Sequence, residues 1–292
     1  MGPLLFSMFI NDIFNTCQHA KMHAYADDIK IYLSGAHDDV VNLCADFNSD
    51  LSSISSWSVR NGLCLNSEKS FVLPVCKRNI YCNVMPSLYI GDKSLKFVSK
   101  VTNLGFVINT SLTCIDHINS VVGKVYYTLR NLRMSATFTP VCIRRKLAIQ
   151  LILPIICYSE LIYSKLDSQS AHKIDVVFNH VTRYVFGLAK YDHISEWKSL
   201  LLGCGIFEYL KARNCIFLFR LMMDKEPSYL FEKLSFTKSA RLTELIVPNY
   251  NYLTSARLFF VNAIRTWNSI PSHIRNSLNI SNFKSVLYSY FR

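Results

Sequence analysis

Two adjacent carboxylates, Asp27 and Asp28, are the residues of this chain best suited to carry chemistry. They lie between two short β-rich runs in the segment MHAYADDIKIYL, a pattern that predicts a hairpin with its turn at the carboxylates. Carboxylates held side by side repel each other, and a hard divalent cation such as Mg²⁺, which prefers oxygen ligands, relieves that repulsion. Two such ions can hold the attacking and leaving oxygens of a phosphoryl transfer. An isolated Asp-Asp pair is more often ordinary turn chemistry, so the dipeptide alone leaves both interpretations open.

Charge is distributed unevenly along the chain. Residues 1–75 hold four basic residues against eight acidic ones, whereas the rest of the chain holds 28 basic against 12 acidic. An acidic front and a strongly basic remainder suit a metal-dependent enzyme head followed by a body that binds a polyanion. On charge alone, the plainer alternative of lysines and arginines that merely solubilise helix faces has similar weight.

Composition excludes several classes of protein. A chain of 292 residues that is half apolar can bury a substantial core, and its start lacks the pattern of a secretory signal. The longest apolar run, Leu147 to Tyr158, is too short for a membrane span and contains Gln150 and Pro154. Ten cysteines show neither a C-x-x-C pair nor paired zinc spacing. We therefore expect reduced thiols in an intracellular protein, cytoplasmic or nuclear, with no membrane and no disulfide-linked partner.

The spacing of apolar residues predicts the elements that position the carboxylates. An apolar helix is expected from Leu4 to Phe14, and an amphipathic helix over 36–61 that Gly62 closes. A turn at Asn66-Ser67, a strand from Phe71 to Leu73 and a further hairpin over 88–109 follow. Beyond Asp116 the pattern is helical, with helices expected over 116–133, from Thr139-Pro140 to about Tyr163, and near 170–186, 206–223 and 255–268.

Several short motifs stand in a fixed order along the chain. Gly2-Pro3-Leu4-Leu5-Phe6 and Ile10-Asn11-Asp12 come first, followed by Tyr25-Ala26-Asp27-Asp28. Later motifs are Asn66-Ser67-Glu68-Lys69-Ser70, Asn103-Leu104-Gly105, the stretch 112–133, and the tail segments 256–264 and 267–275. In this order they resemble the passage from motif B through motifs C, D and E to the thumb and tail of non-LTR retrotransposon reverse transcriptases. The resemblance spans nearly the whole chain, and the order of the motifs carries it.

The resemblance implies an α+β fold and an RNA-directed DNA polymerase. The expected parts are an incomplete polymerase palm over 1–112, thumb-like helices over 113–170 and a helical C-terminal region over 171–292. Mg²⁺ is the implied cofactor of two-metal nucleotidyl transfer. An RNA template, a DNA primer and deoxynucleotides are the implied partners.

Roles for individual residues also follow from the resemblance. Asp27 becomes the principal metal ligand and Asp28 its companion, while Tyr25 packs beneath the nucleotide or primer terminus. Lys69 stands where the family has a candidate proton donor for the departing pyrophosphate. An exposed turn lysine without a role is an equally good interpretation of Lys69.

Five further residues are implied in binding nucleic acid. Leu104 and Gly105 allow a primer backbone to approach closely, because glycine lacks a Cβ; a simple bulge in a strand is the alternative for Gly105. Lys124, Arg130 and Arg133 lie off the apolar stripe of their predicted helix and complete the basic surface.

One element of the family's pattern has no counterpart in this sequence. The fingers and the motif A strand, with its catalytic aspartate, would precede Met1. Possible substitutes lie on or beside helices rather than on a neighbouring strand: Asp12, Asp38, Asp39, Asp46 and Asp50. We therefore expect a fragment that does not polymerise DNA alone and exposes an unpaired sheet edge. The alternatives are a catalytically dead nucleic-acid-binding remnant and a decayed or wrongly started gene product without activity.

Overall fold

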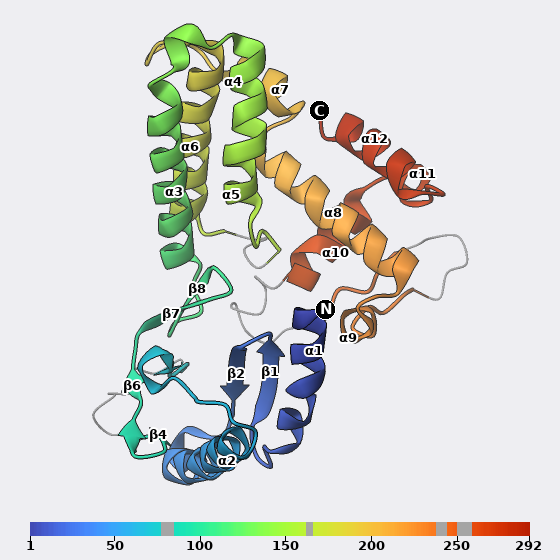
Figure 1. Ribbon diagram of the computed structural model, residues 1–292. Coiled ribbons are helices and arrows are strands. Elements are labelled where there is room, and N and C mark those ends of the chain that lie inside the picture. The colour runs from blue at the N-terminus through green and yellow to red at the C-terminus, as the bar shows by residue number, and fades with distance from the viewer. Residues whose placement is uncertain (77–84, 162–165, 238–243, 250–258) are drawn as a thin grey trace. The chain divides into compact units, whose positions relative to one another are not determined.

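The protein has an α+β fold, as predicted, in a computed structural model that describes residues 1–76, 85–161, 166–237, 244–249 and 259–292. The chain divides into two compact units (Figure 1). The first comprises Met1–Asn103 and Ile108–Thr113, and the second comprises Leu104–Val107 and Cys114–Arg292. The three-part division of palm, thumb and C-terminal region stays a prediction.

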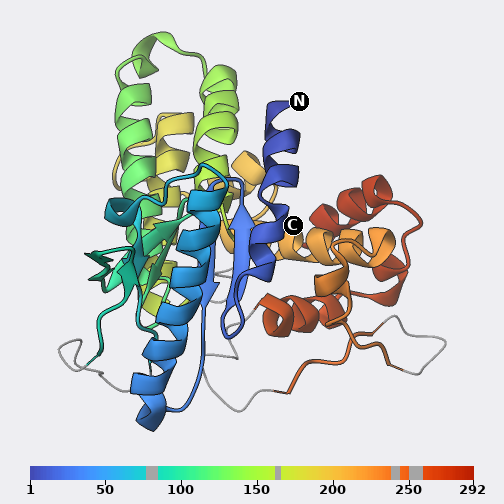
Figure 2. The same ribbon diagram turned by 60° about the horizontal axis from the view of Figure 1, so that its bottom comes forward.

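In the first unit, a two-stranded antiparallel hairpin of β1 (Lys21–Tyr25) and β2 (Asp28–Tyr32) packs against helices. Helix α1 (Gly2–Phe9) and the 3₁₀ turn η1 (Asn11–Asn15) precede it, and η2 (His37–Asp39) and helix α2 (Val40–Arg60) follow it. Figures 1 and 2 both show α1 alongside the hairpin. A core of Ile10, Ile13, Ile54 and Trp57 joins these elements.

The predicted helix from Leu4 to Phe14 is wrong in its second half. Helix α1 ends at Phe9, and the polar pair Asn11-Asp12 begins the separate η1 turn. This tighter turn brings Ile13 into the core, where it is only 1% exposed. By contrast, the predicted glycine end of α2 is confirmed: Gly62 has φ +67°. The N–H groups of Gly62 and Leu63 reach back to Val59 and Ser58, which is a Schellman motif.

The rest of the first unit is built from very short strands. β3 (Phe71–Val72) pairs in parallel with β6 (Lys96–Phe97), and β4 (Tyr89–Ile90) pairs with β5 (Lys93–Ser94). β7 (Lys100–Asn103) and β8 (Phe106–Asn109) form a further two-stranded sheet. The expected hairpin over 88–109 is therefore divided between several pairings. A second core beneath them contains Cys44, Leu51, Leu88 and Leu95.

The second unit begins as a bundle of helices that Figure 1 shows side by side. Its members are α3 (Ile115–Arg133), η5 (Ala136–Phe138), α4 (Val141–Leu147), a π-helical turn η6 (Ala148–Ile152), α5 (Leu153–Cys157) and α6 (Ser168–Phe186). The predicted apolar stripe of α3 is confirmed, since Ile118, Val125 and Leu129 are completely buried.

The helix expected from Pro140 to Tyr163 departs from the prediction in two ways. It widens into η6 immediately before Pro154, because proline cannot donate the hydrogen bond to residue i−4 and its ring crowds that carbonyl. It also ends at Cys157 rather than near Tyr163. The backbone of Tyr158 is extended and Ser159 has φ +59°, so the chain turns away from the helix there.

The remaining helices pack around α8 (Ile206–Asp224), which follows α7 (Ser195–Leu202). They are α9 (Ser228–Phe231), α10 (Phe259–Ser269), α11 (Ser272–Arg275) and α12 (Ile280–Tyr290). Their core includes Trp267 and Phe283. The helices predicted near 170–186 and 206–223 are confirmed. The start predicted at 255 and the tail motif at 256–258 lie outside the described residues.

Candidate active site

The Asp27-Asp28 pair lies at the turn of the β1–β2 hairpin, as the sequence predicts. Tyr25 pairs with Asp28, so Ala26 and Asp27 form a two-residue turn between the strands. Such turns require positive φ at their first central residue, and Ala26 has φ +52°. For an alanine, this left-handed conformation costs roughly 1–2 kcal/mol, because its Cβ crowds the following carbonyl. Both carboxylates are exposed at the tip.

The strands of this hairpin have one covered and one open face. Met22, Ala24, Ile29 and Ile31 are half-buried, and all but the alanine pack against the core beside α1 and α2. The opposite face carries only exposed side chains, namely Lys21, His23, Tyr25, Asp28, Lys30 and Tyr32. We call these six residues the outer face of the hairpin. Successive side chains of a strand point to opposite faces. Burial of the apolar side chains on one face therefore keeps the carboxylate end of the other face exposed.

Asp50 fixes the chain where it enters the hairpin. This carboxylate on α2 is 2% exposed and accepts hydrogen bonds from the backbone N–H groups of Gln18, His19 and Ala20, at 2.9, 3.1 and 2.7 Å. Three donors aimed at one carboxylate form a strong, charge-assisted set. Asp50 is therefore a positioning residue for β1. Sequence reasoning placed it on the helix without a role, because its partners are backbone groups about 30 positions away.

No third metal ligand joins Asp27 and Asp28 among the residues that the structure describes. In that part of the chain, no three His, Cys, Asp or Glu side chains gather closely enough to hold a metal ion. Asp50 is occupied by backbone donors, and Asp39 accepts a hydrogen bond from Asn42. The candidate site thus offers two carboxylates.

Lys69 lies on a well-defined turn that follows α2. Asn66 caps the 3₁₀ turn η3 (Ser67–Lys69), its side-chain oxygen accepting from the N–H groups of Glu68 and Lys69 at 3.1 and 3.2 Å. This confirms the predicted turn. The side chain of Lys69 is exposed and has no ion-pair partner within the described ranges.

Leu104 and Gly105 form the two-residue turn between β7 and β8, so the bulge considered for Gly105 is wrong. Their φ angles are +46° and +79°, the pair of positive values typical of a type I′ turn. A Cβ on Gly105 would meet the ring of Tyr158 at 3.0 Å. The hydroxyl of Tyr158 also donates a hydrogen bond to the carbonyl oxygen of Leu104. The space that glycine leaves open at this turn is occupied by Tyr158.

His117, on α3, contacts the residues that follow this turn. Its ring lies 4.2 Å from that of Phe106, between centroids, and its Nδ1 accepts the backbone N–H of Val107 at 3.4 Å. Burial lowers the pKa of His117, and the charge of Lys124 lowers it further, although a hydrogen bond with the backbone of Tyr158 opposes them. A neutral imidazole suits its acceptor role at Nδ1. Through His117 and Tyr158 the turn belongs to the helical unit.

The three basic residues predicted on α3 are all exposed. Arg130 lies near the middle of the solvent-facing side, and Lys124 and Arg133 lie near its two edges, given 100° per residue. None of the three has an ion-pair partner in the described part of the chain. Tyr127, which is 70% exposed, lies between Lys124 and Arg130. The sequence does not single out this tyrosine by a motif. Its spacing of three residues from Arg130 in a predicted helix is the one signal that places the two side chains near each other.

Two other arginines have a structural use. Arg144 donates through Nη1 to the carbonyl of Tyr184 at 2.8 Å, and Arg145 donates through Nε and Nη2 to the carbonyl of Leu201 at 3.3 and 3.2 Å. Both carbonyls belong to the last turns of helices, which lack partners within their own helix. These cations therefore close the ends of α6 and α7 and are not part of a free basic surface.

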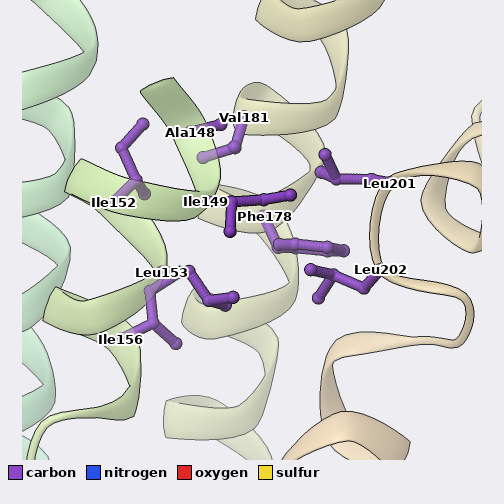
Figure 3. Close-up of a pocket in the computed structure, with 9 residues that line it drawn as sticks. All are labelled: Ala148, Ile149, Ile152, Leu153, Ile156, Phe178, Val181, Leu201 and Leu202. Atoms are coloured by element: carbon purple, nitrogen blue, oxygen red, sulfur yellow. The ribbon is translucent and has the colours of Figure 1, made fainter. Parts of the chain in front are cut away.

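The apolar cavity in the second unit is not a ligand site. It measures about 10 Å³ and is lined by Ala148, Ile149, Ile152, Leu153, Ile156, Phe178, Val181, Leu201 and Leu202 (Figure 3). A space of that size without polar groups is a packing defect between helices. Among the described residues, no helix is both long and apolar enough to cross a bilayer, and no disulfide bond is present.

Comparison with known protein families gives a match for the first part of the chain. Residues 1–108 match the family model described as reverse transcriptase (RNA-dependent DNA polymerase). No curated protein and no solved structure matches the chain. The match covers the first unit almost completely and includes the β1–β2 hairpin. It supports a reverse transcriptase origin for that part and assigns nothing to residues 109–292.

Proposed function

We propose that residues 1–112 belong to the palm of an RNA-directed DNA polymerase of the non-LTR retrotransposon type, and that Asp27 and Asp28 bind its Mg²⁺. The family match covers residues 1–108 of this region. One observation carries the assignment of the site: both carboxylates project at a two-residue turn whose strained first residue, Ala26, holds them at the exposed tip. Strained backbone of this kind is concentrated at functional sites.

The two carboxylates supply the type of ligand atom that Mg²⁺ prefers. Carboxylate oxygens are hard ligands, and Mg²⁺ is commonly held by one or two carboxylates together with substrate phosphates. Bound there, the ions would supply the charge that stabilises the attacking and leaving oxygens of nucleotidyl transfer. Asp27 and Asp28 would hold them, and Tyr25, on the same outer face and 69% exposed, would support the primer terminus. Lys69 remains the proposed proton donor to pyrophosphate.

Catalysis on this proposal needs a third carboxylate. Among the residues the structure describes, none lies beside Asp27 and Asp28. Within the described part of the chain, β1 and β2 pair only with each other, which leaves edge positions for a further strand. We therefore propose that this chain does not extend primers alone, and that an aspartate-bearing strand joins the hairpin in the active enzyme.

The second unit is the proposed thumb and C-terminal region, over 113–170 and 171–292. Lys124, Arg130 and Arg133 would contact the sugar-phosphate backbone of an RNA–DNA duplex, because they are exposed cations without carboxylate partners in the described part of the chain. Leu104 would contact the primer from the turn that Tyr158 holds, and Gly105 would do so through its backbone, because Tyr158 fills the space that its missing Cβ leaves. The proposed location is intracellular, in the cytoplasm or nucleus.

Primer extension with Mg²⁺, an RNA template and a DNA primer tests the enzyme assignment. We expect no incorporation by the chain alone, and incorporation when a segment bearing an additional aspartate strand from the same kind of element is supplied. That activity should disappear in Asp27→Asn. Extension by the unmodified chain alone would contradict the claim that the site is incomplete. Restored extension that survives Asp27→Asn would contradict the role of Asp27.

A binding protein without catalysis is the second candidate. The exposed cations of α3 favour it, because they do not depend on a complete metal site. Duplex affinity should then fall steeply with salt, since each phosphate contact releases counterions. Replacing Arg130 by alanine should reduce the slope of log K against log salt by about 0.9. Binding that ignores salt would exclude this second function.

A further inference from the structure

The outer face of the hairpin carries an ordered set of cationic and aromatic side chains beside the carboxylates. Starting from the turn, the cross-strand pairs on this face are Tyr25 with Asp28, His23 with Lys30, and Lys21 with Tyr32. Pairs on one face recur every two residues, so these three extend over about 14 Å of strand. All six side chains are exposed.

The lysines of this face contrast with their surroundings. Residues 1–75 contain only four basic residues, and Lys21 and Lys30 are two of them. Both lie on the same face of the same hairpin, and neither has an ion-pair partner among the described residues. Lysines that only conferred solubility on this acidic segment would have no reason to gather on one face. Two unpaired cations diagonal to each other across the strands form a local attraction for anions.

Two aromatic rings on the face are already arranged against each other. The rings of His23 and Tyr32 are nearly parallel, with an interplanar angle of 7° and centroids 5.5 Å apart. Nε2 of His23 and the hydroxyl of Tyr32 are 3.2 Å apart and share a hydrogen bond. This contact restrains both rings, so little side-chain freedom is lost when a flat ligand stacks on them.

We propose that the outer face binds one unpaired nucleic-acid strand, with bases stacked on His23 and Tyr32 and phosphates on Lys21 and Lys30, leading to the Asp27-Asp28 turn. Cationic tracks with interleaved aromatic rings bind single strands in this way, since every base offers a π face. A duplex hides the faces of its bases and would use the lysines alone. The inference rests on the proposed function for the nature of its ligand, and adds a second contact surface separate from α3.

The lysines are tested by fluorescence anisotropy of the full chain with a labelled single-stranded oligonucleotide, over a salt series. Lys21→Ala/Lys30→Ala should reduce the slope of log K against log salt by about 1.4, because each phosphate contact to a single strand contributes about 0.7. Lys93→Ala/Lys96→Ala removes the same charge from other exposed strands of the first unit and should change the slope much less. Equal effects of the two double variants would overturn the proposal.

Stacking on the aromatic pair is tested by fluorescence quenching, which contacts between lysines and phosphates do not cause. Tyr32→Trp should gain an emission that is quenched when the oligonucleotide binds. The matched control is Tyr89→Trp, at a tyrosine on β4 that is 47% exposed, against 44% for Tyr32, and its emission should stay unquenched. Ribose and deoxyribose oligonucleotides, tried separately, show which strand is preferred. No quenching at position 32 with either oligonucleotide would refute stacking there, even if the lysine variants bind weakly.

The failure of this inference can be told apart from failure of the proposed function. Arg130→Ala, on α3, serves as the reference in the duplex assay. If Arg130→Ala weakens duplex binding while the hairpin variants leave single-strand binding unchanged, the outer face is wrong and the proposed function stands. If the chain binds neither duplex nor single strand, the proposed function itself is wrong. Circular dichroism and melting of each variant confirm that exposed substitutions leave the fold intact.

Discussion

Tyr158, just after α5, donates its hydroxyl hydrogen bond to the carbonyl oxygen of Leu104, 54 positions earlier in the chain. The ring of Tyr158 occupies the space next to Gly105 that a Cβ would need. Together with His117 on α3, it holds the turn between β7 and β8 against the helical unit. The turn proposed to contact the primer therefore belongs to the helical unit, although strand β7, which leads into it, belongs to the first unit.

Removing only the hydroxyl of Tyr158 should loosen this turn. In Tyr158→Phe, the peptide containing Leu104–Val107 should exchange its amide hydrogens faster, because one hydrogen bond worth about 1 kcal/mol is lost. Hydrogen-exchange mass spectrometry measures the effect. Tyr127→Phe is the control, since Tyr127 is 70% exposed and lies on the open side of α3. Unchanged exchange in Tyr158→Phe would show that the hydrogen bond does not hold the turn.

Two glycine-to-alanine substitutions should have opposite effects. Gly105→Ala places a side chain at φ +79° and 3.0 Å from the ring of Tyr158, and should destabilise the protein by about 1–2 kcal/mol or more. Gly123→Ala, in the middle of α3 with nothing within 4 Å, should stabilise it by about 0.5–1 kcal/mol through helix propensity. Denaturant unfolding provides both values, and a shift of the same sign in the two variants would contradict the geometry.

Loss of the Asp50 carboxylate should be costly. Asp50→Ala leaves the N–H groups of Gln18, His19 and Ala20 without their acceptor, and we expect a loss of about 2–4 kcal/mol in the free energy of unfolding. Asp46→Ala, one turn earlier on α2, breaks only a 3.9 Å contact with His19 and should cost about 0.5 kcal/mol or less. Similar losses in the two variants would refute the positioning role of Asp50.

Stability should fall as the pH drops below the ordinary pKa of histidine, about 6.5. Burial lowers the pKa of His117, so between the folded and unfolded values the unfolded chain binds a proton that the folded chain does not. This contribution is complete above about pH 6.5 and is lost on acidification. His117→Gln should reduce the pH dependence of the free energy of unfolding between about pH 7.5 and 5. A smaller dependence should remain, because burial also lowers the pKa of His180.

The outcome for His117→Gln decides whether this histidine carries the effect. If His117→Gln leaves the whole dependence in place, another group is responsible for it.

Local patterns allowed much of the fold to be predicted. The apolar spacing of α3 and α6, the glycine that ends α2 and the Asn66 turn each depend on residues within a few positions of one another. The carboxylate turn is of the same kind, since β-rich runs flank it on both sides. Pairings between distant short strands, such as β3 with β6, left no periodic pattern to detect.

The parts of the candidate site that escaped prediction depend on distant partners. Asp50 and Tyr158 act on backbone atoms about 30 and 54 positions away, and a backbone acceptor or donor has no sequence signature. Arg144 and Arg145 close the ends of other helices, and nothing in their own segment indicates those partners. In each case, the side chain could be recognised as polar but not assigned its partner.

Metal binding at Asp27 tests the central claim most directly. Mn²⁺ is a paramagnetic substitute for Mg²⁺, and electron paramagnetic resonance can follow its binding to the full chain in the presence of template–primer. Asp27→Asn should weaken binding by at least about tenfold, whereas Asp12→Asn, which replaces an exposed aspartate of η1, should leave it unchanged. Equal Mn²⁺ affinities for Asp27→Asn and the unmodified chain would contradict the claim that these carboxylates form a metal site.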